Sequence, residues 1–304
     1  MTNRRQHIKT NVTFQSHGIT LAGVLYLPDD FMGGMRAGIV CCHPAGGVKE
    51  QTAGRYAEEL SKKGFVTLTF DAARQGDSEG EPRGLEDPFQ RAEDIRSAVS
   101  FLSARSMVDE NRVGILGVCA GGSYVSYTAQ TDRRMKAIAT VSAVDPAGEL
   151  LQDPDMRDFL LNQAGVLRNL EAKGEGAFLT HVNPGTRAEA ESYPARSMFR
   201  ECYDYYVEGP GKHPNSTGWG LLQYDVLAHF LPFEHMDWIA PRPLLMIVGT
   251  EADTRHFSDD AVRTAGDNAE LYEIEGASHM DLYYKDKFVA MAVETLTDFF
   301  GKNL

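Results

Sequence analysis

Short apolar runs alternate with amphipathic segments from residue 38 onward, and this alternation limits the possible folds more than any other feature. The runs are solidly apolar rather than alternating with polar residues, so we expect strands that are buried on both faces. They occupy residues 38–42, 65–70, 112–118, 136–144, 244–249 and 270–276. Helical periodicity marks the intervening residues 50–63, 88–103 and 124–131. The pattern predicts an α/β fold with a mostly parallel central sheet flanked by helices on both faces.

Two regions depart from the alternation. Residues 12–27 alternate around His17 and Gly18, which predicts an antiparallel hairpin. Residues 146–235 hold no convincing buried strand, and residues 156–171 and 196–206 have helical character while 209–220 form a loop. We therefore expect a core of residues 1–145 and 236–304, with residues 146–235 as a mainly helical cap inserted before the penultimate strand. Such a cap lies over the carboxyl edge of the sheet, where doubly wound folds bind ligands.

Charge and composition narrow the choice of partners. The 304 residues include 30 Lys and Arg against 43 Asp and Glu, a formal net charge of −13. This charge repels phosphate backbones, so we expect neither nucleic acid nor a membrane surface as a partner. No apolar run approaches the roughly 20 residues that span a bilayer, and residues 1–20 lack a secretory signal. The chain is therefore expected to be cytoplasmic with reduced thiols, and a homodimer is compatible with the sequence.

The residues G-V-C-A-G-G at positions 117–122 form the sharpest local signal. They follow an expected strand and precede an expected helix, as in the nucleophile elbow G-x-S-x-G, with Cys119 in place of Ser. Small neighbours are required because the turn is tight, and the helix N-terminus favours a thiolate. An alternative interpretation gives Cys119 no catalytic role and treats it as a small buried residue in a Gly-rich turn.

A thiol nucleophile needs a His base and an acid that orients it, in the chain order nucleophile, acid, base. Asp253 follows the expected strand at residues 244–249, and His279 follows the strand at residues 270–276. The order Cys119, Asp253, His279 is therefore the expected one. Glu251 in the same loop is the rival acid.

The segment H-P-A-G-G at positions 43–47 follows the first expected parallel strand. Its free backbone N–H groups lie where this type of fold places half of an oxyanion hole, which predicts the N–H groups of Ala45 and Ala120 as the donors. A metal site at Cys41, Cys42 and His43 is disfavoured, because neighbouring strand residues face opposite sides. The chain has no Gly-rich nucleotide motif, so we expect no cofactor and no metal.

Five segments together resemble the α/β-hydrolase superfamily, and most closely its dienelactone-hydrolase-related branch with fungal polyketide transferase and thiohydrolase-like proteins. They are GVCAGG, HPAGGVKEQT, FDAARQGDSEGEPRGLEDP, VGTEADT and GASHMDLYY. The resemblance covers nearly the whole chain and implies Cys119, Asp253 and His279 as the triad. Dienelactone hydrolases are shorter and lack the cap, so the resemblance does not extend to a lactone substrate.

The leading hypothesis is hydrolysis of an ester, lactone or thioester through an acyl-Cys119 intermediate. The substrate would be a medium-sized organic acyl compound, bound by aromatic and polar cap residues. The candidates are Tyr205, His213, Ser216, Trp219 and Tyr224. One alternative is acyl transfer or cyclisation with the same triad. Another is a non-catalytic ligand-binding protein of this fold, which would show a broken triad.

Overall fold

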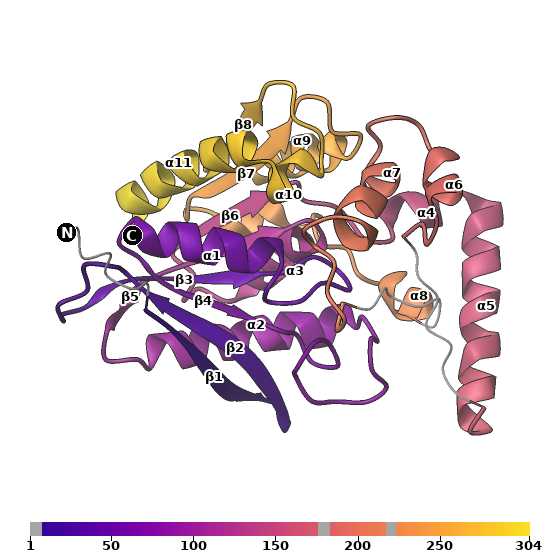
Figure 1. Ribbon diagram of the computed structural model, residues 1–304, viewed down its shortest axis with the longest axis horizontal. Coiled ribbons are helices and arrows are strands. Elements are labelled where there is room, and N and C mark those ends of the chain that lie inside the picture. The colour runs from indigo at the N-terminus through magenta and orange to yellow at the C-terminus, as the bar shows by residue number, and fades with distance from the viewer. Residues whose placement is uncertain (1–7, 176–182, 217–222) are drawn as a thin grey trace.

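A single eight-stranded sheet forms the centre of the computed structural model, which describes residues 8–175, 183–216 and 223–304 (Figure 1). The strand order is β1-β2-β4-β3-β5-β6-β7-β8. The strands are β1 (Ile8–Ser16), β2 (Ile19–Leu27), β3 (Arg36–Cys42), β4 (Val66–Phe70), β5 (Val108–Val118), β6 (Ala137–Val141), β7 (Leu244–Gly249) and β8 (Ala269–Ile274). β1 pairs with β2 and β2 with β4 in antiparallel fashion, whereas the other five pairs are parallel, so the expected mostly parallel sheet is confirmed.

The antiparallel hairpin of β1 and β2 is also confirmed. Ser16 pairs with Ile19, which leaves a two-residue turn of His17 and Gly18 with φ angles of 44° and 85°. Positive φ at both turn residues is the geometry that matches the twist of a hairpin, and Gly18 adopts it without strain.

Helices cover both faces of the sheet (Figure 1). On one face α1 (Thr52–Lys62) packs against α11 (Asp286–Asn303) and the strands β3 and β4. On the other face α2 (Pro88–Ser103) packs against α3 (Ala120–Thr131), and α9 (Arg255–Ala265) packs on β7 and β8. The Asp87 carboxylate accepts the N–H groups of Phe89 and Gln90 and so caps α2 at the expected start.

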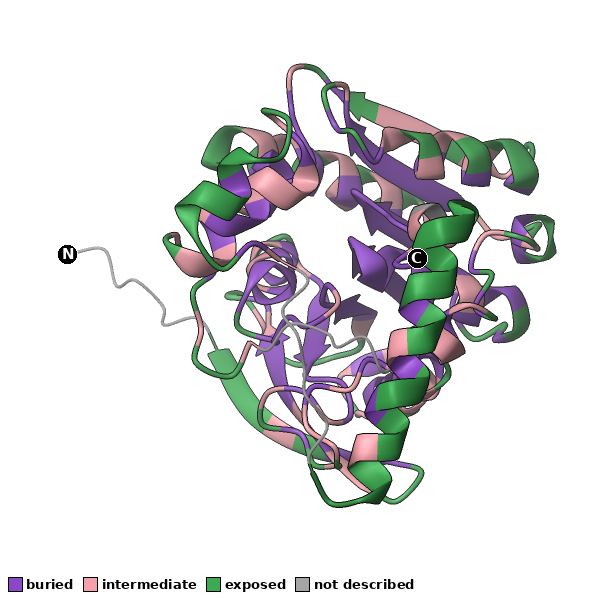
Figure 2. Cartoon of the chain, turned by 90° about the vertical axis from the view of Figure 1, so that its right-hand side faces the viewer, coloured by how far each residue is buried: buried purple, intermediate pink, exposed green. Residues whose placement is uncertain are grey.

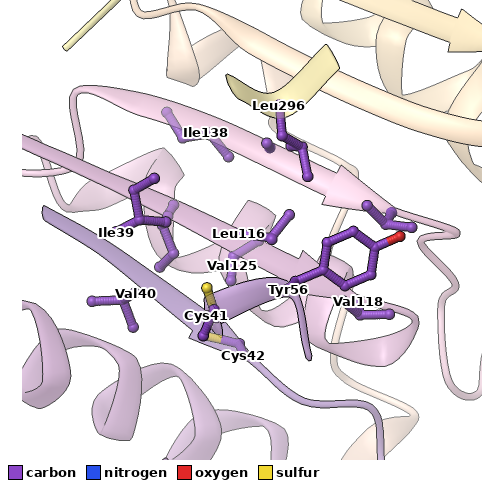
Figure 3. Close-up of a cluster of buried hydrophobic side chains, with 14 of the residues drawn as sticks. Ile39, Val40, Cys41, Cys42, Tyr56, Leu116, Val118, Val125, Ile138 and Leu296 are labelled. Atoms are coloured by element: carbon purple, nitrogen blue, oxygen red, sulfur yellow. The ribbon is translucent and has the colours of Figure 1, made fainter. Parts of the chain in front are cut away.

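The core fills the space between the sheet and these helices. Figure 3 shows side chains of β3, β5 and β6 packed against Tyr56 of α1, Val125 of α3 and Leu296 of α11. All residues of β4 and β6 are buried, as expected for strands covered on both faces. The expectation is wrong for β8, in which only Ile274 is buried. β8 is an edge strand, so fewer neighbours cover its side chains.

The chain between β6 and β7 forms helices and loops, with no strand in the parts of it that the structure describes. Its helices are α4 (Gly148–Gln152), α5 (Pro154–Ala172), α6 (Arg187–Glu191), α7 (Met198–Cys202), the π-helix η1 (Tyr203–Val207), α8 (Tyr224–Leu227) and the 3-10 helix η3 (Met236–Ile239). In Figure 1, α5 stands at the right-hand end of the molecule, and Figure 2 shows that most of its surface is exposed. No helix in the described ranges is long and apolar enough to cross a membrane.

The cap residues belong to two different cores. Leu160, Tyr224 and Leu227 form a small cluster with Ala147. Cys202, Tyr205 and Phe230 instead belong to the main core of the sheet. The expected boundaries at residues 146 and 235 therefore mark where the chain leaves and rejoins the sheet, and they do not separate two independent hydrophobic cores.

Candidate active site

Cys119 occupies a strained turn between β5 and α3. Its φ and ψ are 57° and −126°, a backbone conformation that side-chain-bearing residues rarely adopt. A Cβ added at Gly117 would lie 2.2 Å from the carbonyl oxygen of Gly121, and one at Gly121 would lie 2.6 Å from that of Cys42. Glycine is therefore required at both positions, and the turn has the strand–turn–helix form of a nucleophile elbow.

The Cys119 thiol is nearly enclosed. The residue is 9% exposed, and it lines a cavity of about 90 Å³ beneath the cap. Burial raises the pKa of the Cys119 thiol to about 11, and hydrogen bonds from the Tyr283 hydroxyl and the Ala120 N–H oppose this rise only in part. The expectation that the helix N-terminus favours a Cys119 thiolate is therefore wrong for the resting protein. Desolvation outweighs the helix N-terminus, and the thiol is neutral at pH 7.

This high pKa has a measurable consequence for alkylation. Iodoacetamide is expected to modify Cys119 about a hundredfold more slowly at pH 7.5 than a thiol with a pKa near 9, because the thiolate fraction falls tenfold per pKa unit. The rate should still be rising at pH 10. Peptide mapping after timed labelling between pH 7 and 10.5 measures this profile. A rate that levels off below pH 8.5 would contradict the neutral thiol.

His279 follows β8 and is completely buried. Its Nδ1 lies 2.7 Å from Thr254 Oγ1, and its Nε2 lies 3.2 Å from the Tyr283 hydroxyl oxygen. Burial lowers the pKa of His279 to about 3, so the ring is neutral at any physiological pH. The Ser142 hydroxyl donates to the His279 carbonyl oxygen (3.2 Å), which fixes the backbone of this loop.

The structure contradicts the role expected for Asp253. Asp253 is exposed, and its carboxylate accepts the Met198 N–H at 3.0 and 3.1 Å. The rival Glu251 is also exposed and pairs with Arg196 at 2.8 Å. No carboxylate in the described ranges hydrogen-bonds to His279. Thr254, one residue further along, is buried and faces the ring instead. The loop after β7 therefore presents the Thr254 hydroxyl to His279 and the Asp253 carboxylate to the cap.

The two expected oxyanion donors flank the same cavity. Pro44, Ala45 and Ala120 line it together with Cys119. The Ala120 N–H points to the Cys119 sulfur, and the Ala45 N–H makes no hydrogen bond within the part of the chain that the structure describes. A free N–H beside a nucleophile can donate a hydrogen bond to a developing oxyanion.

A buried ionic network, which no sequence motif marks, supports the loop that carries Ala45. The Glu86 carboxylate is completely buried, accepts the Gly46 N–H (3.1 Å) and pairs with Arg91 Nε (3.3 Å). Arg91 in turn donates to the carbonyl oxygen of His43, at the start of the loop. No sequence signal distinguishes Glu86 from the surface carboxylates around it. In the described ranges, no group of three metal-ligating side chains gathers, and His43 is engaged by Arg91.

The candidate substrate-binding residues lie elsewhere than expected. Tyr205 packs on the Tyr283 ring, with 5.3 Å between centroids, and Tyr224 lies in the small cap cluster. His213 lies near Asp77, and the Ser216 hydroxyl donates to the Gly46 carbonyl oxygen (2.9 Å). None of these four lines the cavity, and Trp219 lies outside the described residues. The lining of the cavity is mostly apolar, and Asp145 and Asn183 add polar groups to it. The apolar lining residues are Val144, Leu150, Met198, Phe199, Tyr206 and Phe257.

The sheet order, the elbow and the buried His after the last strand agree with one family. A model of the alpha/beta hydrolase family matches residues 39–292. The chain belongs to the alpha/beta hydrolase family. It is 36% identical to the uncharacterized protein YcjY of Escherichia coli K12 over 94% of this chain and 95% of that protein. The crystal structure of the hypothetical protein PA2218 from Pseudomonas aeruginosa superposes with a TM-score of 0.88 at 30% identity, covering 98% of this chain and 94% of that chain.

A more distant relative is named for an enzymatic activity. The chain is 25% identical to thiohydrolase aneE of Aspergillus aculeatus, over 89% of this chain and 82% of that protein. Family membership supports an enzyme, whereas the identity of the nucleophile and of the substrate rests on the geometry above.

Proposed function

We propose that this protein hydrolyses esters or thioesters of small acyl groups through a covalent acyl-Cys119 intermediate. The observation that carries the proposal is the strained elbow, which holds the Cys119 thiol at the wall of an apolar cavity. Alpha/beta hydrolases act on such bonds, and one relative is named a thiohydrolase. Because both Cys119 and His279 are neutral at rest, His279 acts as a general base during the attack rather than as half of an ion pair.

In the first step the Cys119 sulfur bonds to the acyl carbon while its proton passes to His279. The N–H groups of Ala45 and Ala120 stabilise the oxyanion, and the proton then leaves with the departing alcohol or thiol. In the second step water, deprotonated by His279, attacks the thioester carbon. The bond to the Cys119 sulfur breaks, the acid is freed, and the proton on His279 returns to the sulfur. The reaction needs an unprotonated Nε2 on His279, so Nδ1 carries the proton, and Thr254 Oγ1 at 2.7 Å, rather than Asp253, accepts it.

The cavity favours a smaller acyl group than the sequence suggested. An apolar cavity of about 150 Å³ accommodates benzene, a molecule of six carbons. The volume of about 90 Å³ therefore fits an acyl group of about two to four carbons. Its mostly apolar lining, with the Asp145 carboxylate as its acidic group, further favours an uncharged aliphatic chain.

Trapping the intermediate tests this proposal. Mixing the protein with the p-nitrophenyl esters of acetate, butyrate and octanoate should give a mass increase equal to the acyl group for acetate and butyrate, located on Cys119 by peptide mapping. Cys119→Ala is expected to show no such adduct and to lose at least about a thousandfold in kcat/KM. An adduct elsewhere, or full activity in Cys119→Ala, would refute Cys119 as the nucleophile. A preference for octanoate would refute the small acyl group.

A second candidate is transfer of the acyl group to an acceptor other than water. The completely buried His279 and the apolar lining favour it, because both limit the access of water to the thioester. Adding an alcohol or amine acceptor to the acyl-Cys119 form distinguishes the two. A transferase would consume the thioester faster with the acceptor, and a hydrolase would not.

A further inference from the structure

The hydroxyl of Tyr283 lies between the candidate nucleophile and the candidate base. Its oxygen is 3.2 Å from His279 Nε2, Tyr283 and Cys119 line the same cavity, and the hydroxyl acts on the Cys119 thiol as a hydrogen-bond partner that lowers its pKa. The hydrogen bonds of the described residues include none directly between Cys119 and His279. In a nucleophile–base pair of the usual kind these two groups touch.

The fold holds Tyr283 firmly in this position. His279 and Tyr283 are four residues apart, and α10 (Asp281–Tyr284) places the tyrosine ring 5.5 Å from the imidazole. Tyr205 of η1 packs edge-on against it at 5.3 Å. The residue is 1% exposed, and the Tyr56 hydroxyl donates to the carbonyl oxygen of its neighbour Leu282 (2.8 Å). The hydroxyl cannot leave the site without repacking these aromatic rings.

From this geometry we infer that Tyr283 is a further catalytic residue, whose hydroxyl carries the proton between Cys119 and His279. The inference rests on the proposed function for its substrate, but the contact between the three side chains does not depend on any substrate.

The proton transfer balances without a net charge on the tyrosine. As the Cys119 sulfur bonds to the acyl carbon, its proton moves to the Tyr283 oxygen, and the hydroxyl proton of Tyr283 moves to His279 Nε2. A hydroxyl suits this position because it donates one proton and accepts at two lone pairs. Burial and the nearby Cys119 and Tyr206 hold the pKa of Tyr283 well above its usual value, so no phenolate accumulates. The imidazolium returns the proton to the leaving group along the same path.

Two measurements on Tyr283→Phe test the inference, with Tyr284→Phe as the matched control. Tyr284 is the next residue, is half-buried and packs on Tyr205 at 5.5 Å. The first measurement is alkylation of Cys119 by iodoacetamide at pH 9, which needs no substrate. Loss of the hydroxyl removes a hydrogen bond that stabilises the thiolate, so the rate in Tyr283→Phe is expected to fall about tenfold. Tyr284→Phe should alkylate at the rate of the unmodified protein.

The second measurement is a double-mutant cycle on the single-turnover acylation by p-nitrophenyl acetate. Tyr283→Phe is expected to slow acylation about a hundredfold, within the range of general acid–base effects. If the hydroxyl acts through His279, adding Tyr283→Phe to His279→Gln should cost almost nothing more. If the rate losses of the two single variants multiply in the double variant, Tyr283 acts independently of His279. Its role would then be structural, and the inference would be overturned. An unchanged Tyr283→Phe, in either measurement, would overturn it as well.

The outcomes separate this inference from the proposed function. Absence of any acyl-Cys119 in the unmodified protein refutes the proposed function, and the alkylation measurement still decides the role of Tyr283. Normal acylation in Tyr283→Phe refutes the relay alone. If Tyr283→Phe fails to fold, 3,5-difluorotyrosine at position 283 keeps the ring packing and makes the hydroxyl more acidic. The inflection of the alkylation profile should then move to lower pH, and an unchanged profile would contradict the relay.

Discussion

Replacing His279 by Gln should lower the acylation rate with p-nitrophenyl acetate about a thousandfold or more. The side chain is the base of the proposed reaction, and Gln fills a similar volume without accepting a proton. Thr254→Val is expected to lower the rate about 10- to 100-fold, because it leaves the buried Nδ1 of His279 without its partner at 2.7 Å. Such an unsatisfied group costs about 1–3 kcal/mol.

Asp253→Asn is the matched control for these variants. Its carboxylate is exposed and accepts the Met198 N–H, so it should change the rate less than about threefold. Stopped-flow release of p-nitrophenolate under single-turnover conditions gives all three rates. If the acylation rate of Asp253→Asn falls as far as that of His279→Gln while the rate of Thr254→Val is unchanged, Asp253 is the residue that orients His279.

The fold was predictable from the sequence because it depends on residues that act locally. Runs such as residues 38–42 and 244–249 have no polar face, so they can only be strands covered on both sides. The pair His17 and Gly18 fixes the hairpin turn by its φ angles alone. β8 was mispredicted because its position at the sheet edge depends on strand order, which hydrophobic periodicity does not encode.

The site was predictable only where backbone position decides it. The turn at Cys119 and the loop at His279 follow strands, so their places in the chain determine their places at the edge of the sheet. Which side chain of the loop after β7 faces His279 depends on loop geometry, and there Thr254 and Asp253 point in different directions. Tyr283 lines the same cavity as Cys119, and its ring packs against Tyr205 of η1, a contact between residues far apart in sequence.

Exchange of Arg91 for Met is expected to destabilise the fold by about 3–5 kcal/mol, the usual cost of removing one partner of a buried ion pair. Arg91 is nearly buried and lies over the Tyr124 ring at 4.6 Å, and Met keeps much of that apolar contact. What remains is the Glu86 carboxylate, completely buried and without its cation. The matched control is Arg96→Met on the same helix. Arg96 is about one-third exposed and lies 3.7 Å from Glu93, so its loss should cost less than about 1 kcal/mol.

Urea unfolding followed by fluorescence measures both free energies, and a second substitution identifies the cause. If the destabilisation comes from the unpaired carboxylate, the double variant Arg91→Met with Glu86→Gln should be more stable than Arg91→Met alone, because Gln carries no charge into the core. Gln also retains an oxygen that can accept the Gly46 N–H, so the loop that carries Ala45 keeps its anchor. Equal stability of the single and double variants would instead assign the loss to the hydrogen bond from Arg91 to the His43 carbonyl oxygen, and the Glu86 charge would then have no part in holding the oxyanion loop.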